Sequence, residues 1–218
     1  MTDASAYEAD AIRYAVLRKL ASGMRHALVT ELQTIQFSAE LAARMQHGGA
    51  NGPELATNLE RMSDQVRAAI DSARSVIEWL RPDDNATTTV DEALQQCLRV
   101  AGDDWRLRGI EASTTVRTGG ARVSRAALHD LLVTSLLALI DTHPGAIDIE
   151  VAAESADEDV VLRLRARSSE RRSPFPSLTV YRSLTCEDVA TMGRAHGVEC
   201  SCAGDSVTLR LPAVPAVA

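Results

Sequence analysis

Aromatic residues and lysine are nearly absent from this chain of 218 residues. Phenylalanine, tryptophan and tyrosine together make up 3% of it, and Lys19 is the only lysine. The many alanine and leucine residues favour a core of packed helices over an aromatic sheet core. Apolar residues make up 45% and charged residues 24%, a balance that is ordinary for a globular protein and argues against intrinsic disorder.

Clustered positive charge is also missing, and this excludes one class of partner. The formal net charge is −7, whereas a protein that binds nucleic acid needs clustered cations to displace counterions from the phosphates. No nucleic-acid partner is therefore expected.

Arg163, Arg165 and Arg167 are a local exception, because they alternate along one predicted strand. We expect them to form a solvated strand face, with binding of an anion or of an acidic protein surface as the alternative.

Apolar runs of membrane length do not occur in the sequence. The longest candidate, Leu131–Ile140, is far shorter than the ~20 residues that a membrane-spanning helix needs. The first residues do not have the pattern of a signal peptide either. We therefore expect a cytoplasmic protein with no membrane partner.

The four cysteines have neither the spacing nor the neighbouring histidines of a metal site. Cys200 and Cys202 are expected to lie on the same face of a strand as small, half-buried thiols. The sequence therefore predicts no bound metal. The other two cysteines are Cys97 and Cys186.

Two long helices are predicted for the first half of the chain. No proline occurs from about Ala6 to Gln46, and apolar residues recur there in steps of three and four, as on a helix with one apolar stripe. A turn is predicted at residues 47–52. Pro53 then begins a second helix, whose apolar residues have heptad-like spacing. The two stripes consist of Leu17, Leu20, Met24, Leu28, Leu32, Ile35 and Ala39, and of Leu55, Leu59, Met62, Val66, Ile70, Ala73, Val76 and Leu80.

A hairpin of two such helices cannot cover its own apolar surface. Pairing two hairpins into a four-helix bundle would cover it, so the sequence predicts a homodimer. The first domain is predicted to span residues 1–82. Residues 81–85, Arg-Pro-Asp-Asp-Asn, are the predicted boundary.

Short strands alternate with helices in the second half, which is predicted to form a domain over residues 86–218. Helices are predicted at 91–107, at 124–142 with Ser124 as its N-cap, and at Cys186–His196, and residues 168–177 are predicted as a loop. This order suggests an α+β sandwich in which helices cover one face of a sheet. The predicted strands are Thr87–Val90, Ile110–Val116, Ile147–Ala153, Val160–Ala166, Val198–Cys202 and Ser206–Leu211.

The first helix contains a motif that resembles the H-box, the phosphoacceptor region of sensor histidine kinases. Residues 24–35 read MRHALVTELQTI. The family usually has S-H-E-L-R-T-P-L-x-x-I at the positions that correspond to residues 25–35, so its histidine corresponds to His26. The resemblance makes His26 the phosphoacceptor and Thr30 an accessory residue. The acid that normally follows the histidine is Ala27 here, and the usual proline is Glu31.

The second domain resembles the ATP-binding domain of the same family. Residues 131–141, LLVTSLLALID, are similar to its N-box helix, and residues 188–197 and 206–212 are similar to its last helix and closing strands. Ala138 replaces the asparagine that holds Mg²⁺ in the family. No Gly-x-Gly occurs anywhere, so the adenine-reading turn and the glycine-rich lid are both missing. The resemblance therefore implies a degenerate domain, retained as a scaffold or docking surface, that binds no ATP.

His26 is predicted to be exposed, because at 3.6 residues per turn it lies nearly opposite Leu28. A neutral imidazole nitrogen is nucleophilic at neutral pH, although a surface histidine without a role is the alternative. Phe37, three turns further along the same line, is expected either to contact a docked receiver domain or to pack inside the bundle. The residues predicted to contact the partner are Arg25, Gln33 and Phe37.

The resemblance implies a histidine phosphotransferase that relays phosphoryl groups between His26 and the aspartate of a response-regulator receiver domain. The receiver would supply Mg²⁺ and its own acid cluster, so this chain is expected to bind no cofactor. Thr30 has an alternative role in positioning water for receiver dephosphorylation, which the loss of the acid at Ala27 disfavours. A non-catalytic, pseudokinase-like module that docks receivers or kinases is the main alternative. An active kinase with an unrecognised nucleotide site is a third hypothesis.

Overall fold

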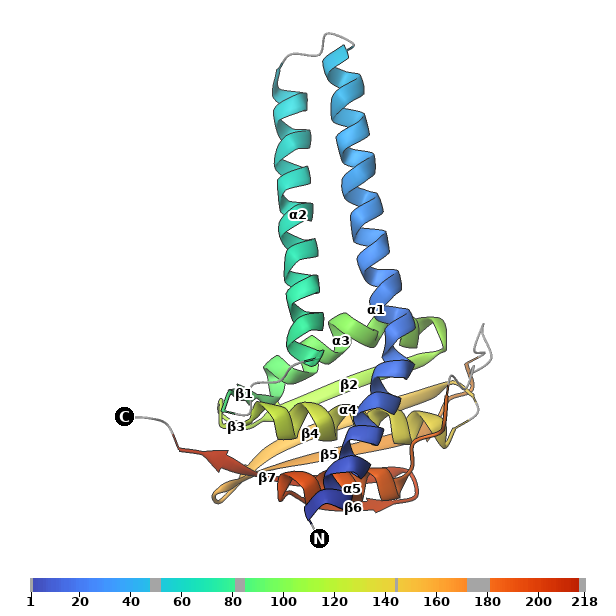
Figure 1. Cartoon of the computed structure of the whole chain (residues 1–218), viewed down its shortest axis with the longest axis vertical. Helices are drawn as coiled ribbons and strands as arrows, with labels where there is room; N and C mark the ends of the chain where they lie inside the picture. The colour runs from blue at the N-terminus through green and yellow to red at the C-terminus, as the bar shows by residue number, and fades with distance from the viewer. Residues whose placement is uncertain (1, 48–51, 81–84, 144, 172–180, 216–218) are drawn as a thin grey trace. The chain divides into compact units, whose positions relative to one another are not determined.

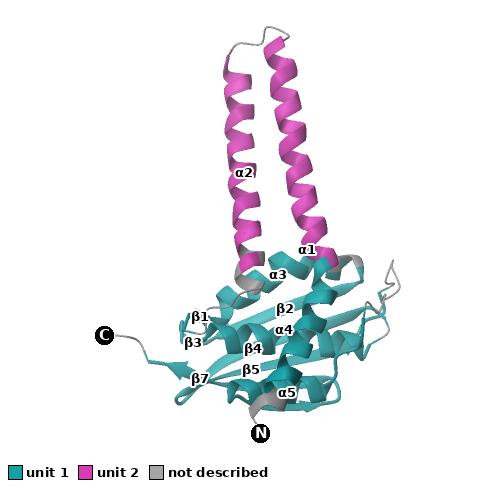
Figure 2. Ribbon diagram, viewed as in Figure 1, with its two compact units in different colours: residues 1–21, 82–218 teal, residues 22–81 magenta. Residues whose placement is uncertain are grey.

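The chain divides into two compact units (Figure 2). One unit combines residues 1–21 with residues 82–218, and the other comprises residues 22–81. The domain bounds expected from the sequence, 1–82 and 86–218, remain a prediction. A division into compact units does not show which segments fold independently. The computed structural model describes residues 2–47, 52–80, 85–143, 145–171 and 181–215.

Both predicted long helices are confirmed. Helix α1 spans Thr2–His47 and helix α2 spans Pro53–Leu80, with Pro53 in the first turn as predicted. Most of the predicted turn at 47–52 and of the predicted boundary at 81–85 lies outside the described residues, as does the second half of the predicted loop at 168–177.

A mixed sheet of seven strands forms the centre of the larger unit (Figure 1). The strands are β1 Thr87–Thr89, β2 Ile110–Arg117, β3 Arg122–Ser124, β4 Ile147–Ala156, β5 Asp159–Ser168, β6 Glu199–Ala203 and β7 Ser206–Val214. Their spatial order is β1-β3-β7-β5-β4-β2, and β6 pairs with β7. All pairs are antiparallel except β2 with β4. The predicted strands are confirmed, and the three residues of β3 were missed.

Three helices cover one face of this sheet, as predicted. They are α3 Val90–Leu107, α4 Arg125–Asp141 and α5 Cys186–His196. Ser124 caps α4 by accepting a hydrogen bond from the amide of Ala127, which confirms the predicted cap. Helix α5 ends at Gly197 in the left-handed conformation, which glycine adopts at little cost. The sequence therefore predicts the class of the fold correctly: a helical hairpin followed by an α/β layer.

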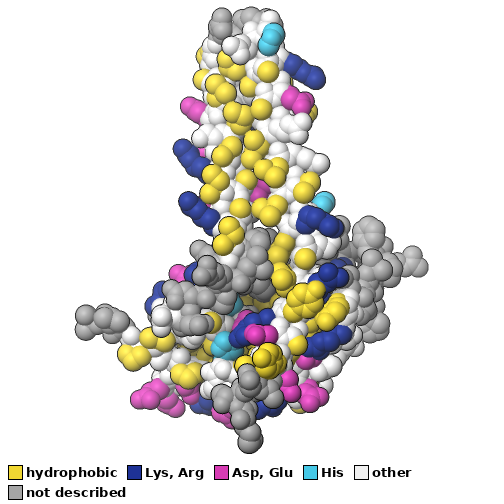
Figure 3. All heavy atoms as spheres, in the orientation of Figure 1, with side chains coloured by type: hydrophobic (Ala, Val, Ile, Leu, Met, Phe, Trp, Pro, Cys, Tyr) yellow, Lys and Arg dark blue, Asp and Glu magenta, His cyan; other side chains and the backbone are white. Residues whose placement is uncertain are grey.

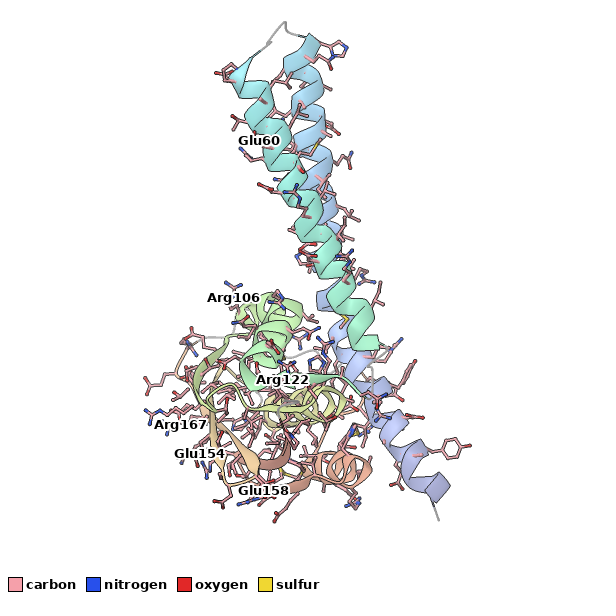
Figure 4. All side chains as sticks on the ribbon, turned by 90° about the vertical axis from the view of Figure 1, so that its left-hand side faces the viewer. Glu60, Arg106, Arg122, Glu154, Glu158 and Arg167 are labelled. Atoms are coloured by element: carbon pink, nitrogen blue, oxygen red, sulfur yellow. A yellow bond between two sulfur atoms is a disulfide. The ribbon has the colours of Figure 1, made fainter. Side chains whose placement is uncertain are left out.

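The opposite face of the sheet carries charged residues in ion pairs. Arg163 pairs with Glu154 at 2.6 Å and Arg167 pairs with Glu150 at 3.0 Å. Figure 4 shows Glu154 and Arg167 on the strands, on the side away from α4 and α5. The prediction of a solvated strand face is confirmed, and acidic neighbours from β4 already compensate these two arginines.

Helix α4 is buried on nearly all sides, which its sequence explains. Leucine, alanine and valine occur around its whole circumference, so no polar face is available for solvent. The sheet and the helices α3 and α5 cover much of it. The first part of α1 belongs to the same unit and buries its own apolar side chains there. These side chains are Ala9, Ile12, Ala15, Val16 and Leu20.

Asp141, the last residue of α4, joins α1 to the segment that precedes α5. Its carboxylate accepts a hydrogen bond from Lys19 Nζ at 2.9 Å and another from the Leu184 amide at 2.7 Å. The side chains of Lys19 and Asp141 are 8% and 9% exposed. The only lysine of the chain is therefore a buried structural residue.

Asp130 makes a second connection between α1, α4 and α5. Its Oδ2 accepts a hydrogen bond from Arg13 Nε at 2.8 Å and lies 2.8 Å from His196 Nε2. Burial raises the pKa of the Asp130 carboxyl, but His196 and Arg13 more than offset this, so its pKa lies below the ordinary value.

Replacing Lys19 should destabilise the protein strongly. In Lys19→Ala, the buried Asp141 carboxylate loses its counter-ion, and removal of one partner from a buried pair costs ~3 kcal/mol. Arg18→Ala is the matched control, because Arg18 is an exposed neighbour on the same helix and should change the unfolding free energy by less than ~0.5 kcal/mol. Urea denaturation followed by circular dichroism measures both. Equal effects of the two substitutions would contradict the structural role of the pair.

Asp130 should contribute to the stability of the protein against acid. Because its pKa is lower in the folded chain than in the unfolded chain, its contribution is complete above the unfolded value of about 3.9 and is lost as the pH falls through the folded value. The unfolding free energy of Asp130→Asn should therefore fall less steeply below pH ~4 than that of the wild type. Asp64→Asn, at an exposed ion pair, should follow the wild-type slope.

Candidate functional site

His26 lies on the exposed surface of α1, as its position in the helical period predicts. Its side chain is exposed, while Met24 two residues earlier is buried. Among the described residues, no side chain forms a hydrogen bond or ion pair with the His26 ring. The imidazole is therefore accessible to a second protein, and this chain does not fix its orientation.

Three other predicted site residues share the face of His26. Thr30, Gln33 and Phe37 follow it by four, seven and eleven residues, and all are exposed. At about 100° per residue these steps return to nearly the same side of the helix. Phe37 is 69% exposed, so it does not pack between the helices of its own hairpin. Arg25 is also exposed, but it lies ~100° around the helix from His26.

The two helices of the hairpin meet through polar side chains. Ser38 Oγ donates to Gln65 Oε1 at 2.8 Å, and Asn58 Nδ2 donates to the Ser38 carbonyl at 3.1 Å. Further along, Ser72 Oγ donates to Glu31 Oε1 at 2.8 Å. Glu31, which stands where the H-box that this motif resembles has proline, thus points between the helices and away from His26.

Apolar side chains lie exposed on one flank of the hairpin. On α2, Leu59, Val66, Ile70 and Ile77 are all exposed, and their spacing of seven, four and seven residues places them on one side of the helix. Leu32 of α1 is 60% exposed. In Figure 3, hydrophobic side chains run along both helices of the hairpin on the side that faces the viewer. The predicted stripes are therefore only partly buried within one chain. The side chains of Val76 and Leu80 lie outside the described set.

The region that resembles a nucleotide site contains arginines in place of glycines. Arg171 forms ion pairs with Glu111 of β2 and Asp148 of β4, and Arg167 pairs with Glu150. Ala138 is buried in α4 and offers no ligand oxygen. The described residues include no group of three or more acidic, cysteine or histidine side chains that could hold a metal ion.

The expectation of two free thiols in β6 was wrong for one of them. Cys202 forms a disulfide with Cys186, while Cys200 is free. The two bonded cysteines are 16 residues apart, at the start of α5 and in β6. Only the tertiary pairing of these elements brings them together, so cysteine spacing gave no signal for the bond.

Solved structures that resemble the chain include histidine kinases, or domains of them, and a bacterial phosphotransferase. The chain is similar to histidine kinase ThkA in its complex with the response regulator TrrA (14% identity, TM-score 0.43, 98% of this chain and 67% of that chain). It is also similar to the ATP-binding domain of PrrB from Mycobacterium tuberculosis (20% identity, TM-score 0.43, 61% of this chain and 100% of that chain). The third structure is a bacterial phosphotransferase, solved at 1.7 Å (13% identity, TM-score 0.40, 88% of this chain and 93% of that chain).

No family model matches the sequence, and no curated protein matches it either. At these identities and TM-scores the solved structures carry no functional argument. Inferences about function therefore depend on the residues of this chain. No helix in the described part of the chain is long and apolar enough to cross a membrane.

Proposed function

We propose that the chain is a histidine phosphotransferase that exchanges a phosphoryl group between His26 and the aspartate of a response-regulator receiver domain. The observation that carries this proposal is the exposure of His26 within an H-box-like sequence, on the same face as Thr30, Gln33 and Phe37. A receiver domain needs free access to the imidazole, and an exposed phenylalanine beside it offers an apolar anchor for docking.

The transfer needs few groups from this chain. A neutral ring nitrogen of His26 attacks the phosphorus of the aspartyl phosphate, the bond from phosphorus to the carboxylate oxygen breaks, and the ring gives up its N–H proton to solvent. Ala27 and Glu31 do not assist the transfer of the His26 proton. Ala27 has no acid group, and the Glu31 carboxylate accepts a hydrogen bond from Ser72. The receiver therefore supplies the Mg²⁺ and the acidic groups, and this chain binds no cofactor of its own. Arg25 and Gln33 are additional partner contacts in this account.

The working form of the protein is a homodimer. The exposed flank formed by Leu32, Leu59, Val66, Ile70 and Ile77 is continuous over both helices, and its burial against a second copy would complete a four-helix bundle. His26 lies nearly opposite Leu28, away from this flank, so it would remain accessible in the dimer.

Transfer of radioactive phosphate from phosphorylated receiver domains tests the phosphotransferase. Wild-type protein should acquire an acid-labile label, and His26→Ala should lose it completely because the nucleophile is gone. His47→Ala is the matched control, since His47 is an exposed histidine on the same helix, and it should accept the label as the wild type does.

Two results would overturn the proposal. Label on His26→Ala would place the acceptor elsewhere. Absence of label from every receiver tested, together with tight binding to one of them, would favour the non-catalytic docking module. Incubation with ATP and Mg²⁺ alone should give no label, and label there would instead identify an active kinase.

A charge on the apolar flank should weaken the dimer. In Ile70→Glu, each copy would bury a carboxylate without a partner at the interface, so the dissociation constant should rise at least ~100-fold. Leu41→Glu is the control, because Leu41 is also an exposed apolar residue but lies on the other side of α1. Analytical ultracentrifugation over a concentration series measures both. A wild-type monomer, or equal effects of the two substitutions, would contradict the dimer.

A further inference from the structure

Cys186 and Cys202 connect the start of α5 to the strand β6. Their disulfide joins residues whose Cα atoms are 5.5 Å apart, which is an ordinary separation for such a bond. Both residues are partly exposed, so we expect small thiols in solution to reach the bond. Accessibility distinguishes this pair from the buried disulfides that serve only to stabilise a fold.

The position of Cys186 favours breakage and re-formation of the bond. It is the first residue of the 11-residue helix α5, where the helix dipole stabilises a thiolate and makes it a good leaving group. Glu187 and Asp188 act against this effect. Arg182 compensates Asp188, because its two terminal nitrogens donate to both carboxylate oxygens at 3.0 and 2.9 Å.

The other two cysteines do not compete for this chemistry. Burial raises the pKa of the Cys97 thiol to about 12, and burial together with Glu199 raises that of Cys200 to about 11. Both therefore remain thiols at neutral pH and react slowly. Cys186 and Cys202 form an isolated pair, and Cys200, two residues from Cys202 in the same strand, provides a matched control.

The bond lies next to the contacts that hold the first part of α1. The Leu184 amide, two residues before Cys186, donates to the same Asp141 carboxylate that pairs with Lys19. Three residues further back, the ring of Tyr181 contacts that of Tyr14 edge to face, with centroids 5.7 Å apart. Residues 181–185 thus connect the disulfide to α1.

The rest of α5 is held independently of the disulfide. Val189 and Met192 are completely buried, and His196 lies 2.8 Å from the Asp130 carboxylate. Strand β6 also keeps its ladder with β7. Loss of the disulfide should therefore loosen the start of α5 and residues 181–185 without unfolding the domain.

We propose that Cys186 and Cys202 form a reversible thiol–disulfide switch that controls how firmly residues 181–185 and the first part of α1 are held. The oxidant is a low-molecular-weight disulfide such as oxidised glutathione. The Cys186 thiolate attacks it, forms a mixed disulfide and releases one glutathione thiolate. The Cys202 thiolate then attacks the Cys186 sulfur and releases the second. Two protein thiols become one disulfide, one glutathione disulfide becomes two thiols, and the reverse reaction restores the reduced protein.

Thiol counting and hydrogen exchange on the full chain test the switch together. The folded protein is treated with oxidised glutathione, quenched rapidly with acid, denatured and labelled with a maleimide. Oxidised glutathione should remove two of the reactive thiols, and reduced glutathione should restore both. On reduction, amide exchange in residues 181–186 and 6–21 should accelerate at least ~10-fold. Cys200→Ser should behave like the wild type in its exchange, whereas Cys186→Ser and Cys202→Ser should exchange fast under both conditions.

Three results would overturn the switch. The first is a disulfide that forms but resists reduction until a denaturant unfolds the protein, which would make it a purely structural bond. The second is a thiol count that does not change on oxidation. The third is a pair that cycles while exchange in residues 6–21 stays the same, which would separate the disulfide from α1. Because no phosphoryl transfer is measured, these outcomes are independent of the function proposed for His26.

Discussion

The hairpin places polar side chains between its two helices and leaves an apolar stripe exposed on one flank. Ser38, Gln65 and Asn58 hydrogen-bond across the seam, while Leu32 and Ile70 remain in water. Such a continuous apolar flank is seldom left exposed to water, because each buried apolar Å² is worth ~25 cal/mol. The proposed homodimer rests on this constraint, and in that proposal one side of α1 packs against a second copy while another side presents His26.

Helix α1 has a further role, because its first part belongs to the larger unit. Lys19 and Arg13 bind the two aspartates of α4, and Ala15 and Val16 between them are buried. Helix α4, which carries apolar residues around its whole circumference, depends on such cover. The arginines Arg167 and Arg171 pair with acids of the sheet in the region where a kinase would need glycines. The larger unit thus has a layered architecture, and these two arginines are paired with acids of its own sheet.

Local sequence patterns predict the elements of this fold well. Helical periodicity, Pro53 and the Ser124 cap gave the helices, and alternation gave six of the seven strands. The exposure of His26 follows from the same periodicity. Contacts between distant segments left no such signal: Lys19 with Asp141, Arg13 with Asp130 and His196, and the Cys186–Cys202 bond all depend on the tertiary fold. The polar contacts between α1 and α2 were not predicted, because they depend on which residues of the two helices come to lie opposite one another.

The most direct test of the central claim is to locate the phosphate by mass spectrometry after reaction with a phosphorylated receiver, under alkaline conditions that preserve phosphohistidine. The account predicts phosphate on His26 and on no other histidine of the chain. Phosphate on a different residue would contradict the proposed acceptor. An unmodified chain that nevertheless binds the receiver through the face of Phe37 would show that this helix is a docking surface and takes no part in phosphoryl transfer.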